Sequence, residues 1–268
     1  MTLTRADIGI WLINLPRDTD RRARMDRQLS DMGLSYTLFS AVDGRAEESR
    51  LMANADAAAY ARNMGGPLLP GKLGVYASHL SVWEALIASD HCAALILEDD
   101  VVFHDDFAQA LDTALANHEL WDIVRFNCIR AKVQVTQARL GPYRLNAYVG
   151  PFTGNAAYLI HRDVAVRLAP KLWPQTRALD HELNRFFLHD YRQLGLEPWS
   201  CHPDDQGSSS ITGKNFDMVK KPRWWKRLPY YRNKAMNYVR RAVWLGRNGM
   251  LRPRRDRMRD PSNAAGPK

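Results

Sequence analysis

Three consecutive acidic residues follow a short apolar segment near the middle of the chain. Glu98, Asp99 and Asp100 come directly after the apolar residues 95–97. Carboxylates this close together repel one another unless a cation or solvent lies between them. In an extended chain Glu98 and Asp100 point to the same side, and two hard oxygen ligands suit Mg²⁺ or Mn²⁺. The alternative interpretation is a solvated turn whose acids cap the following helix.

Several other chemical motifs are excluded. No G-x-G-x-x-G opens a helix after the first apolar run, which argues against a dinucleotide-binding protein. Residues 66–72 fit the spacing of a P-loop, but Leu73 stands where a Ser or Thr would hold magnesium, and Pro67 and Pro70 remove backbone donors. The G-x-S-x-G motif of many hydrolases is also absent from the sequence.

The acids belong to a chain whose apolar pattern predicts alternating strands and helices, and therefore an α/β fold with a mainly parallel sheet covered on both faces. Strands are predicted at residues 8–15, 36–42, 93–97, 123–126 and 156–160. Helices are predicted from Asp18 to Gly33, over 74–89, after Asp106, and from Asp180 through Leu194. Ligands bind such sheets at the carboxyl ends of the strands, which is where the three acids fall.

Composition places limits on the class of protein. The 268 residues are 46% hydrophobic and 25% charged, which is ordinary globular composition for one large domain or two small ones. The three cysteines are odd in number and lack zinc-ligand spacing, so neither a disulfide framework nor a zinc module is expected. This cysteine content suits a reducing compartment. Neither a signal peptide nor a membrane-spanning run is predicted.

The net charge of +9 is unevenly distributed. Residues 214–268 contain 17 Lys and Arg but three acids and carry +14, whereas residues 1–213 carry −5. This asymmetry predicts an enzyme-like body at 1–213 and a basic, aromatic-rich tail at 214–268, with the boundary near 207–213. The last residues, 261–268, are rich in Pro, Gly, Ser, Asn and Ala and are predicted to be disordered.

The tail contains a predicted amphipathic helix that starts near Pro229 and ends at Gly246. The apolar face is predicted to consist of Tyr231, Ala235, Tyr238, Val239, Ala242 and Leu245, with Arg232, Lys234, Arg240 and Arg241 mostly on the other side. One interpretation is an anchor on an anionic membrane surface. The other is a helix packed on the body with a solvated basic face.

Ordered sequence blocks in the body resemble glycosyltransferase family 25, the lipooligosaccharide galactosyltransferase-like family. The resemblance covers about residues 8–211, and Pro16 and residues 201–203 depart from the family pattern. The blocks are Ile13-Asn14-Leu15-Pro16-Arg17 with Asp20-Arg21-Arg22 and Ala41-Val42-Asp43-Gly44, then Gly71-Lys72-Leu73-Gly74 with Ser78-His79-Leu80 and Trp83-Glu84, Leu97-Glu98-Asp99-Asp100-Val101, Thr153 to Ile160, and Ala178-Leu179-Asp180.

The resemblance implies a GT-A type, Rossmann-like fold and an enzyme that uses a nucleotide-sugar donor and a divalent metal. Glu98 and Asp100 would hold Mn²⁺ or Mg²⁺, which neutralises the charge that develops on a departing nucleoside diphosphate. Asp99 would bind the metal or the ribose. Asp180 would be the general base for the acceptor hydroxyl in an inverting transfer, or would only cap a helix.

Further site residues come from the other blocks. Asn14, Arg17 and Arg21 follow the first predicted strand, where the donor nucleotide would lie, or they form a solvated helix start. Asp43 would contact the nucleoside or would only make the local turn. His79 is predicted either to contact the donor or to be a satisfied core histidine, because it lies on an apolar helical stripe.

The leading hypothesis is a metal-dependent glycosyltransferase that moves galactose from UDP-galactose to a lipooligosaccharide or other surface glycan. The tail would hold it on the inner face of the cytoplasmic membrane. A sugar nucleotidyltransferase is an alternative, although the first strand lacks the Gly-rich loop that such enzymes carry. A second alternative is a nucleic-acid-binding protein that acts through the tail. No nucleic acid partner is expected, however, because the body of such a protein would have no reason to carry three acids at the end of a strand.

Overall fold

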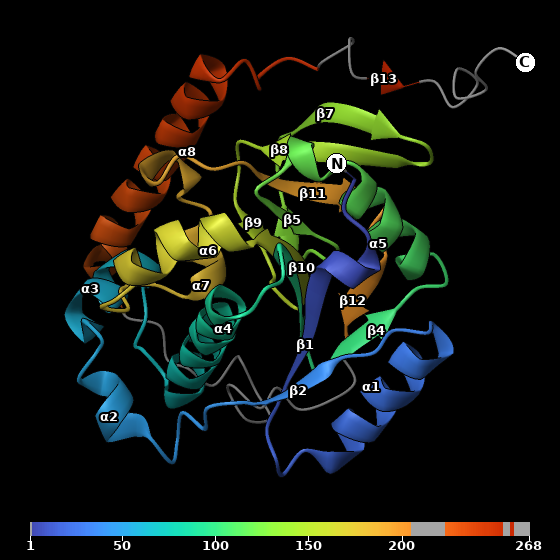
Figure 1. Cartoon of the computed structure of the whole chain (residues 1–268). Coiled ribbons are helices and arrows are strands. Elements are labelled where there is room, and N and C mark those ends of the chain that lie inside the picture. The colour runs from blue at the N-terminus through green and yellow to red at the C-terminus, as the bar shows by residue number, and fades with distance from the viewer. Residues whose placement is uncertain (1, 205–222, 254–257, 260–268) are drawn as a thin grey trace, which may run out of the picture.

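The computed structural model describes residues 2–204, 223–253 and 258–259, which fold around one nine-stranded sheet (Figure 1). Its strand order is β13-β7-β8-β11-β5-β10-β3-β1-β2. The strands are β1 (Ile8–Asn14), β2 (Thr37–Ser40), β3 (Ala93–Glu98), β5 (Ile123–Arg125), β7 (Gln134–Leu140), β8 (Tyr143–Tyr148), β10 (Ala157–His161), β11 (Gln193–Glu197) and β13 (Met258–Arg259).

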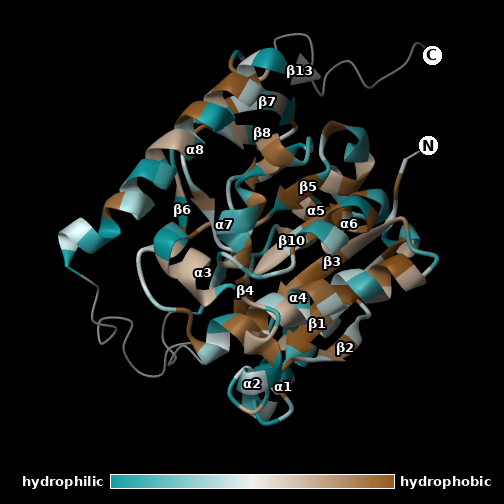
Figure 2. Ribbon diagram, turned by 90° about the vertical axis from the view of Figure 1, so that its left-hand side faces the viewer, coloured by the Kyte–Doolittle hydropathy of each residue, from teal (hydrophilic) through white to brown (hydrophobic). Residues whose placement is uncertain are grey.

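The sheet is mainly parallel, as the sequence predicts. β1 lies between β2 and β3 and is parallel to both, and β11 is parallel to β5. Among the described strands only β8 and β10 run against the others. β1 and β3 are apolar almost throughout because both faces of the sheet are covered, and Figure 2 shows these central strands in hydrophobic colours. The predicted α/β class is therefore confirmed.

Helices cover the two faces of the sheet. α4 and α6 pack against each other on one side, and α1 and α5 lie on the other (Figure 1). α4 carries no single apolar stripe and is buried almost all round, as its sequence predicts. The helices are α1 (Thr19–Asp31), α2 (Glu48–Met52), α3 (Ala57–Met64), α4 (Pro70–Ala88), α5 (Phe107–Ala116), α6 (Arg162–Leu168), α7 (Leu179–Leu183) and α8 (Leu228–Arg247), with 3-10 turns at Arg5–Asp7, His118–Leu120, Ala169–Lys171, Phe186–Leu188 and Trp224–Arg227.

Two small ribbons lie beside the carboxyl edge of the central strands. β4 (Val101–Phe103) continues the chain after the acids and pairs antiparallel with β12 (Cys201–Pro203). β6 (Arg130–Ala131) pairs antiparallel with β9 (Phe152–Thr153). Both ribbons bring distant parts of the sequence to the same edge of the sheet, next to the three acids.

The tail helix α8 packs on the body, chiefly against α3 and the turn at Phe186–Leu188 (Figure 1). Trp244 meets Phe186 edge-on at 4.9 Å between ring centroids, and Leu245 is 1% exposed. The predicted face of this helix was partly wrong. Arg241, expected on the solvated side, is buried and donates from Nε to the carbonyl of Val149, whereas Val239 is exposed. Arg241 is tolerated there because a carbonyl accepts from its guanidinium.

The predicted long helix from Asp180 is also wrong. α7 ends at Leu183, a 3-10 turn follows, and Leu194 lies inside strand β11. Asp190 adopts a left-handed backbone with φ of 53°, which breaks the helical path before the strand. The apolar residues of this segment still point inward, so the apolar pattern predicted their burial correctly but not the type of secondary structure.

The remaining predicted strands and helices are confirmed, with shifts of a few residues at their ends. The β7–β8 hairpin and the short helices α2, α3 and α6 were not predicted. The predicted domain boundary at 207–213 and the predicted disorder of 261–268 lie outside the described residues. No helix in the described part of the chain combines the length and apolarity needed to cross a membrane.

Candidate active site

A polar network ties the carboxyl ends of β1 and β3 together. Because the strands are parallel neighbours with Ile13 opposite Glu98, Asn14 and Asp99 leave the sheet at the same edge. Asn14 donates from Nδ2 to Asp99 at 2.7 Å, and Arg21 of α1 donates to the other oxygen of that carboxylate at 2.9 Å. Burial raises the pKa of Asp99, and the contacts from Asn14 and Arg21 oppose that rise. Asp99 is thus held by protein donors, although it lines the smaller pocket together with Glu98 and Asp100.

Glu98 and Asp100 face the same space, and their surroundings fit a divalent cation. Burial, and then the negative charge of Glu98, raise the pKa of Asp100 to about 7. One carboxylate oxygen of Asp100, Oδ1, is buried without a hydrogen-bond partner. No group of three or more candidate ligands converges among the described residues. Two carboxylates nevertheless suit Mg²⁺ or Mn²⁺, because such ions take their other ligands from phosphates and water.

His79 of α4 holds Glu98 through a buried hydrogen-bond chain. Its Nε2 lies 3.1 Å from Glu98 Oε1 and its Nδ1 lies 3.1 Å from the hydroxyl of Tyr158, which accepts from Trp83 at 2.9 Å. With Trp83 donating to that oxygen, the Tyr158 hydroxyl is free to donate to Nδ1, which leaves Nε2–H for the carboxylate. His79 is therefore satisfied in the core and also orients a predicted metal ligand.

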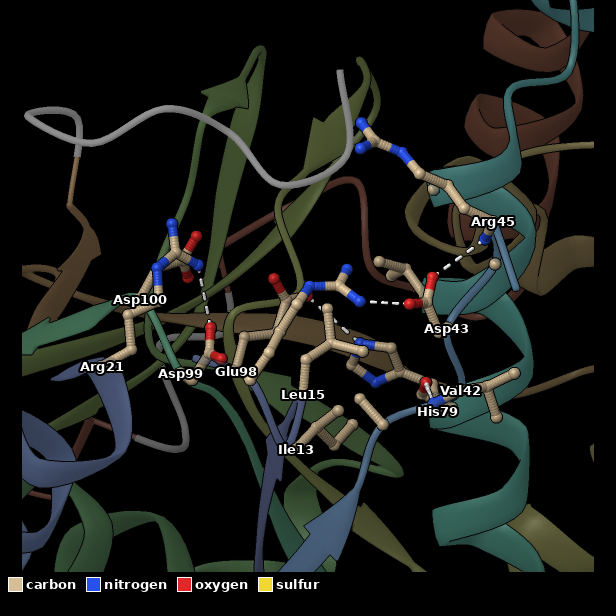
Figure 3. A pocket seen from close by; sticks show the side chains of 16 residues that line it. Ile13, Leu15, Arg21, Val42, Asp43, Arg45, His79, Glu98, Asp99 and Asp100 are labelled. Carbon is tan, nitrogen blue, oxygen red and sulfur yellow. Dashed lines mark hydrogen bonds and ion pairs between the residues drawn. The ribbon is translucent and has the colours of Figure 1, made fainter. Parts of the chain in front are cut away.

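The predicted donor-side residues Arg17 and Asp43 form an ion pair at the mouth of the site. Asp43 also accepts from the backbone of Arg45 at 3.0 Å, and the Arg17 guanidinium holds the pKa of Asp43 below its usual value. Figure 3 shows Asp43 and Arg45 on one side of the pocket and Arg21, Asp99 and Asp100 on the other, with Glu98 and His79 between them.

Close backbone contact explains why the Asp-Gly turn and the start of α4 share the site. A Cβ atom on Gly44 would lie 1.8 Å from the carbonyl oxygen of Pro70, and one on Gly74 would lie 2.5 Å from that of Val42. Ser78 strengthens the contact, since its hydroxyl accepts from the Val42 backbone at 2.8 Å. Only glycine permits this close approach, so the Asp43-Gly44 turn and the start of α4 pack directly against each other.

Two connected cavities meet at the acids. The smaller pocket extends from Glu98 and Asp100 toward Arg17 and Asp43. The larger cleft, of about 770 Å³, extends from the same acids toward Asp180 and α8 and has the size of ordinary ligand sites. The residues that line both are Arg21, Val75, His79, Glu98 and Asp100.

Asp180 lies in the larger cleft, in the first turn of α7. The backbone N–H groups of His181 and Gly154 donate to its carboxylate at 2.8 and 3.3 Å. The residue before the helix is Ala178, so Asp180 is not the N-cap. Arg125 lies nearby, fully buried, and donates to the carbonyl of Phe152 at 2.7 Å. A half-exposed carboxylate held by backbone donors suits proton acceptance at a bound hydroxyl.

The structure adds cleft residues that the sequence did not single out. Asp204 follows β12, and its backbone N–H donates to the Asp100 carbonyl at 2.7 Å while its carboxylate pairs with Arg24. Lys72 and Lys234 line the same cleft from α4 and α8. No local pattern marks Asp204 or Lys234, whereas Lys72 belongs to a sequence block that resembles the family.

Comparisons with known proteins converge on one family. A family model described as glycosyltransferase family 25 (LPS biosynthesis protein) matches residues 7–180. A "glycosyltransferase 25 family member" of Aedes aegypti is 28% identical over 220 residues, covering 72% of this chain and 34% of that protein. The "procollagen galactosyltransferase 1-B" of Xenopus laevis is 26% identical over 252 residues, covering 81% of this chain and 40% of that protein.

Some relatives carry names that deny activity. A "probable inactive glycosyltransferase 25 family member 3" of Rattus norvegicus is 32% identical over 132 residues, covering 43% of this chain and 22% of that protein. The chain thus spans between about a fifth and two fifths of the length of these relatives. Similarity by itself therefore leaves the activity to be argued from this chain's own residues.

Proposed function

The chain belongs to glycosyltransferase family 25, and from this premise we propose that it is an active, metal-dependent hexosyltransferase. It would take the hexose from a nucleotide-sugar donor and join it to a hydroxyl of a surface glycan. The single observation that carries the proposal is the pair of carboxylates, Glu98 and Asp100, at the border of two connected cavities, with one oxygen of Asp100 buried and unpartnered.

The chain's own residues divide the work. The smaller pocket, with Arg17, Arg21 and Asp43, would bind the nucleoside and diphosphate. Glu98 and Asp100 would hold Mn²⁺ or Mg²⁺, which supplies positive charge to the departing diphosphate. Asp180 would accept the proton of the attacking hydroxyl in the larger cleft, where its backbone donors keep the carboxylate oriented.

The proposed donor is UDP-galactose and the proposed acceptor is a lipooligosaccharide or related glycan. The description of the matching family model names LPS biosynthesis, and one relative is named a galactosyltransferase. A smaller pocket that is connected to a larger cleft suits a bisubstrate transfer in which the donor and the acceptor enter from different sides.

The proposal also places the enzyme on the inner face of the cytoplasmic membrane, bound through α8. The outward side of this helix carries the exposed apolar residues Leu228, Met236, Val239 and Val243. Exposed arginines flank them at 232, 240 and 247, and Trp224 is 66% exposed just before the helix. Apolar side chains bordered by arginines complement an anionic lipid surface.

The experiment that tests the activity is a screen of UDP-sugars, with and without Mn²⁺, on the intact protein and on Asp100→Asn. The intact protein should consume one UDP-sugar in a metal-dependent reaction. The variant should lose at least about 10²-fold in rate, because an amide removes a charged ligand that stabilises the leaving group. UDP release, rather than pyrophosphate release, separates glycosyl transfer from nucleotidyl transfer.

Asp105→Asn is the matched control, because Asp105 is an exposed acid that does not line either cavity. It should leave the rate within about twofold, in keeping with a surface substitution away from the site. Full metal-dependent transfer by Asp100→Asn, in protein with an unchanged circular dichroism spectrum, would remove the basis of the proposal.

A further inference from the structure

The walls of the larger cleft differ in charge. Glu98 and Asp100 lie at its border with the smaller pocket, whereas Lys72, Arg130 and Lys234 line it from α4, β6 and α8. α8 therefore forms part of the cleft: Tyr230, Lys234, Asn237, Tyr238 and Arg241 recur at helical spacing along its inner side and all line the cavity. The tail helix thus supplies one wall of the proposed site.

The cations of this wall have no carboxylate partner among the residues that the structure describes. Elsewhere in the cleft, Arg21 pairs with Asp99 and Arg177 with Glu182. Within residues 2–204, 223–253 and 258–259, by contrast, no carboxylate pairs with Lys72, Arg130 or Lys234.

Lys72 is the most costly of these cations to leave unpaired. It is half-buried, and burial lowers its pKa, an effect that the charge of Asp180 only partly opposes. A partly desolvated ammonium without a counter-ion is unfavourable by itself, and a bound anion would relieve that cost.

Arg241 adds a fourth positive charge behind this wall. Its guanidinium is buried, donates from Nε to the Val149 carbonyl at 2.7 Å and lies 4.9 Å from the ring centroid of Tyr238. These contacts orient the charge but do not neutralise it. The α8 side of the cleft therefore has a surplus of positive charge that no carboxylate in the described part of the chain balances by an ion pair.

The donor occupies the other side of the acids. The smaller pocket contains no residue of α8 or β6, so a nucleoside bound there would lie apart from the wall that carries Lys234 and Arg130. The acceptor has to approach the hexose from the larger cleft, since the nucleotide blocks the opposite direction. The surplus charge therefore faces the acceptor.

We propose that the acceptor is an anionic glycan, which places a phosphate or carboxylate group against Lys234 and Arg130, with Lys72 deeper in the cleft. This inference rests on the proposed function and adds the substrate class. Charge-assisted hydrogen bonds from lysine and arginine to such a group are stronger than those to a neutral hydroxyl. The wall selects an acceptor by its charge and holds its sugar hydroxyl near Asp180.

The test is equilibrium binding of glucose, glucose 6-phosphate and glucuronate to the full chain with saturating UDP and Mg²⁺. Filling the donor side first prevents the probes from binding where the diphosphate does. Both anionic probes should bind at least about 10-fold more tightly than glucose, and added salt should weaken this preference. Lys234→Gln should lower the affinity for the anionic probes about 5- to 10-fold and leave that for glucose unchanged.

Lys226→Gln is the matched control, because Lys226 is an exposed lysine just before α8 that does not line the cleft. It should leave all three affinities unchanged, whereas Lys234→Gln combined with Arg130→Gln should bring the anionic probes close to glucose. The side chains of Lys226, Lys234 and Arg130 are all exposed, so these substitutions should not affect folding.

Three results would overturn the inference. The first is equal binding of the three probes, and the second is an unchanged affinity of Lys234→Gln for glucose 6-phosphate. The third is a preference that exists only without UDP, which would assign these cations to the donor diphosphate. A failure of the proposed function shows separately, as absence of metal-dependent UDP-sugar consumption, and does not affect the binding measurement.

Discussion

Asp180 is the side chain whose role depends most on its exact surroundings. Its carboxylate accepts hydrogen bonds from two backbone N–H groups, at 2.8 and 3.3 Å. Asp180 lines the larger cleft but not the smaller pocket. Those donors fix the direction in which the carboxylate oxygens point. An unattached carboxylate on the same cleft would be oriented less well for a bound hydroxyl.

Asp180→Asn should lower kcat about 10²- to 10⁴-fold, the range by which a positioned general base accelerates a reaction. The KM for the UDP-sugar should change little, because Asp180 does not line the donor pocket.

Asp163→Asn provides the comparison, because Asp163 is an exposed acid on α6. It should keep the wild-type kcat and KM. If Asp180→Asn retains most of kcat, another group accepts the proton and the assignment of Asp180 fails.

At this scale the sequence predicted which residues meet, but not how they divide their contacts. By residue type alone, the roles of Glu98, Asp99 and Asp100 cannot be distinguished. The parallel register of β1 and β3 brings Asp99 to Asn14 and Arg21, so that Asp99 lines only the smaller pocket, whereas Glu98 and Asp100 line both cavities. Likewise, an apolar helical stripe cannot show that His79 lies within hydrogen-bond distance of Glu98.

At the scale of elements, α8 combines two interfaces in one helix. Its inner side packs on α3 and lines the cleft, and its outer side exposes Val239 at 56% and Val243 at 47% between arginines. The amphipathic pattern predicted a helix with the correct ends. It could not identify the buried side, because two opposite sides both contain apolar residues and only the shape of the body decides between them.

Val239→Asp combined with Val243→Asp should reduce binding to vesicles of anionic lipid at least about 10-fold, because each change removes apolar area from the membrane contact and adds a negative charge. Flotation with anionic and with neutral vesicles measures this. Donor consumption in solution should be unchanged, since neither residue lines the cavities.

Val166→Asp on α6 is the matched control, as this valine is 49% exposed on a different helix. It should float with anionic vesicles as the intact protein does. Equal flotation of the α8 double variant would show that the outer face of this helix does not bind lipid.

At the scale of the whole molecule, the tail helix and the body share packing. Leu245 is 1% exposed and belongs to the main hydrophobic cluster, together with Met250 beyond the end of the helix. Arg241, Trp244 and Asn233 also bond to residues of the body. We therefore expect α8 to unfold with the body in one transition rather than as a separate module.

Leu245→Ala should lower the free energy of unfolding by about 2–5 kcal/mol, the usual cost of removing a buried leucine side chain. Leu228→Ala in the same helix should cost less than about 1 kcal/mol, because Leu228 is 54% exposed. Urea denaturation followed by circular dichroism and by tryptophan fluorescence measures both variants. A Leu245→Ala protein as stable as the parent, or two separate transitions, would contradict this shared packing.

The sequence by itself determined the α/β class, the family, the acidic strand end and the division of charge between body and tail. These properties follow from local periodicity and from residue types at fixed spacing, which survive without knowledge of long-range contacts. It also located Asn14, Arg17, Arg21, Asp43, His79 and Asp180 in the blocks that line the two cavities.

The tertiary structure decided which of these side chains line a cavity and which contact one another. It converted the predicted helix after Asp180 into a short helix, a turn and strand β11, because a buried apolar run is equally compatible with a helix and with a central strand. It also brought Lys234 of the tail into the cleft that Lys72 and Asp180 line. Contacts between residues more than a hundred positions apart depend on how elements pack, and no local pattern in the chain encodes them.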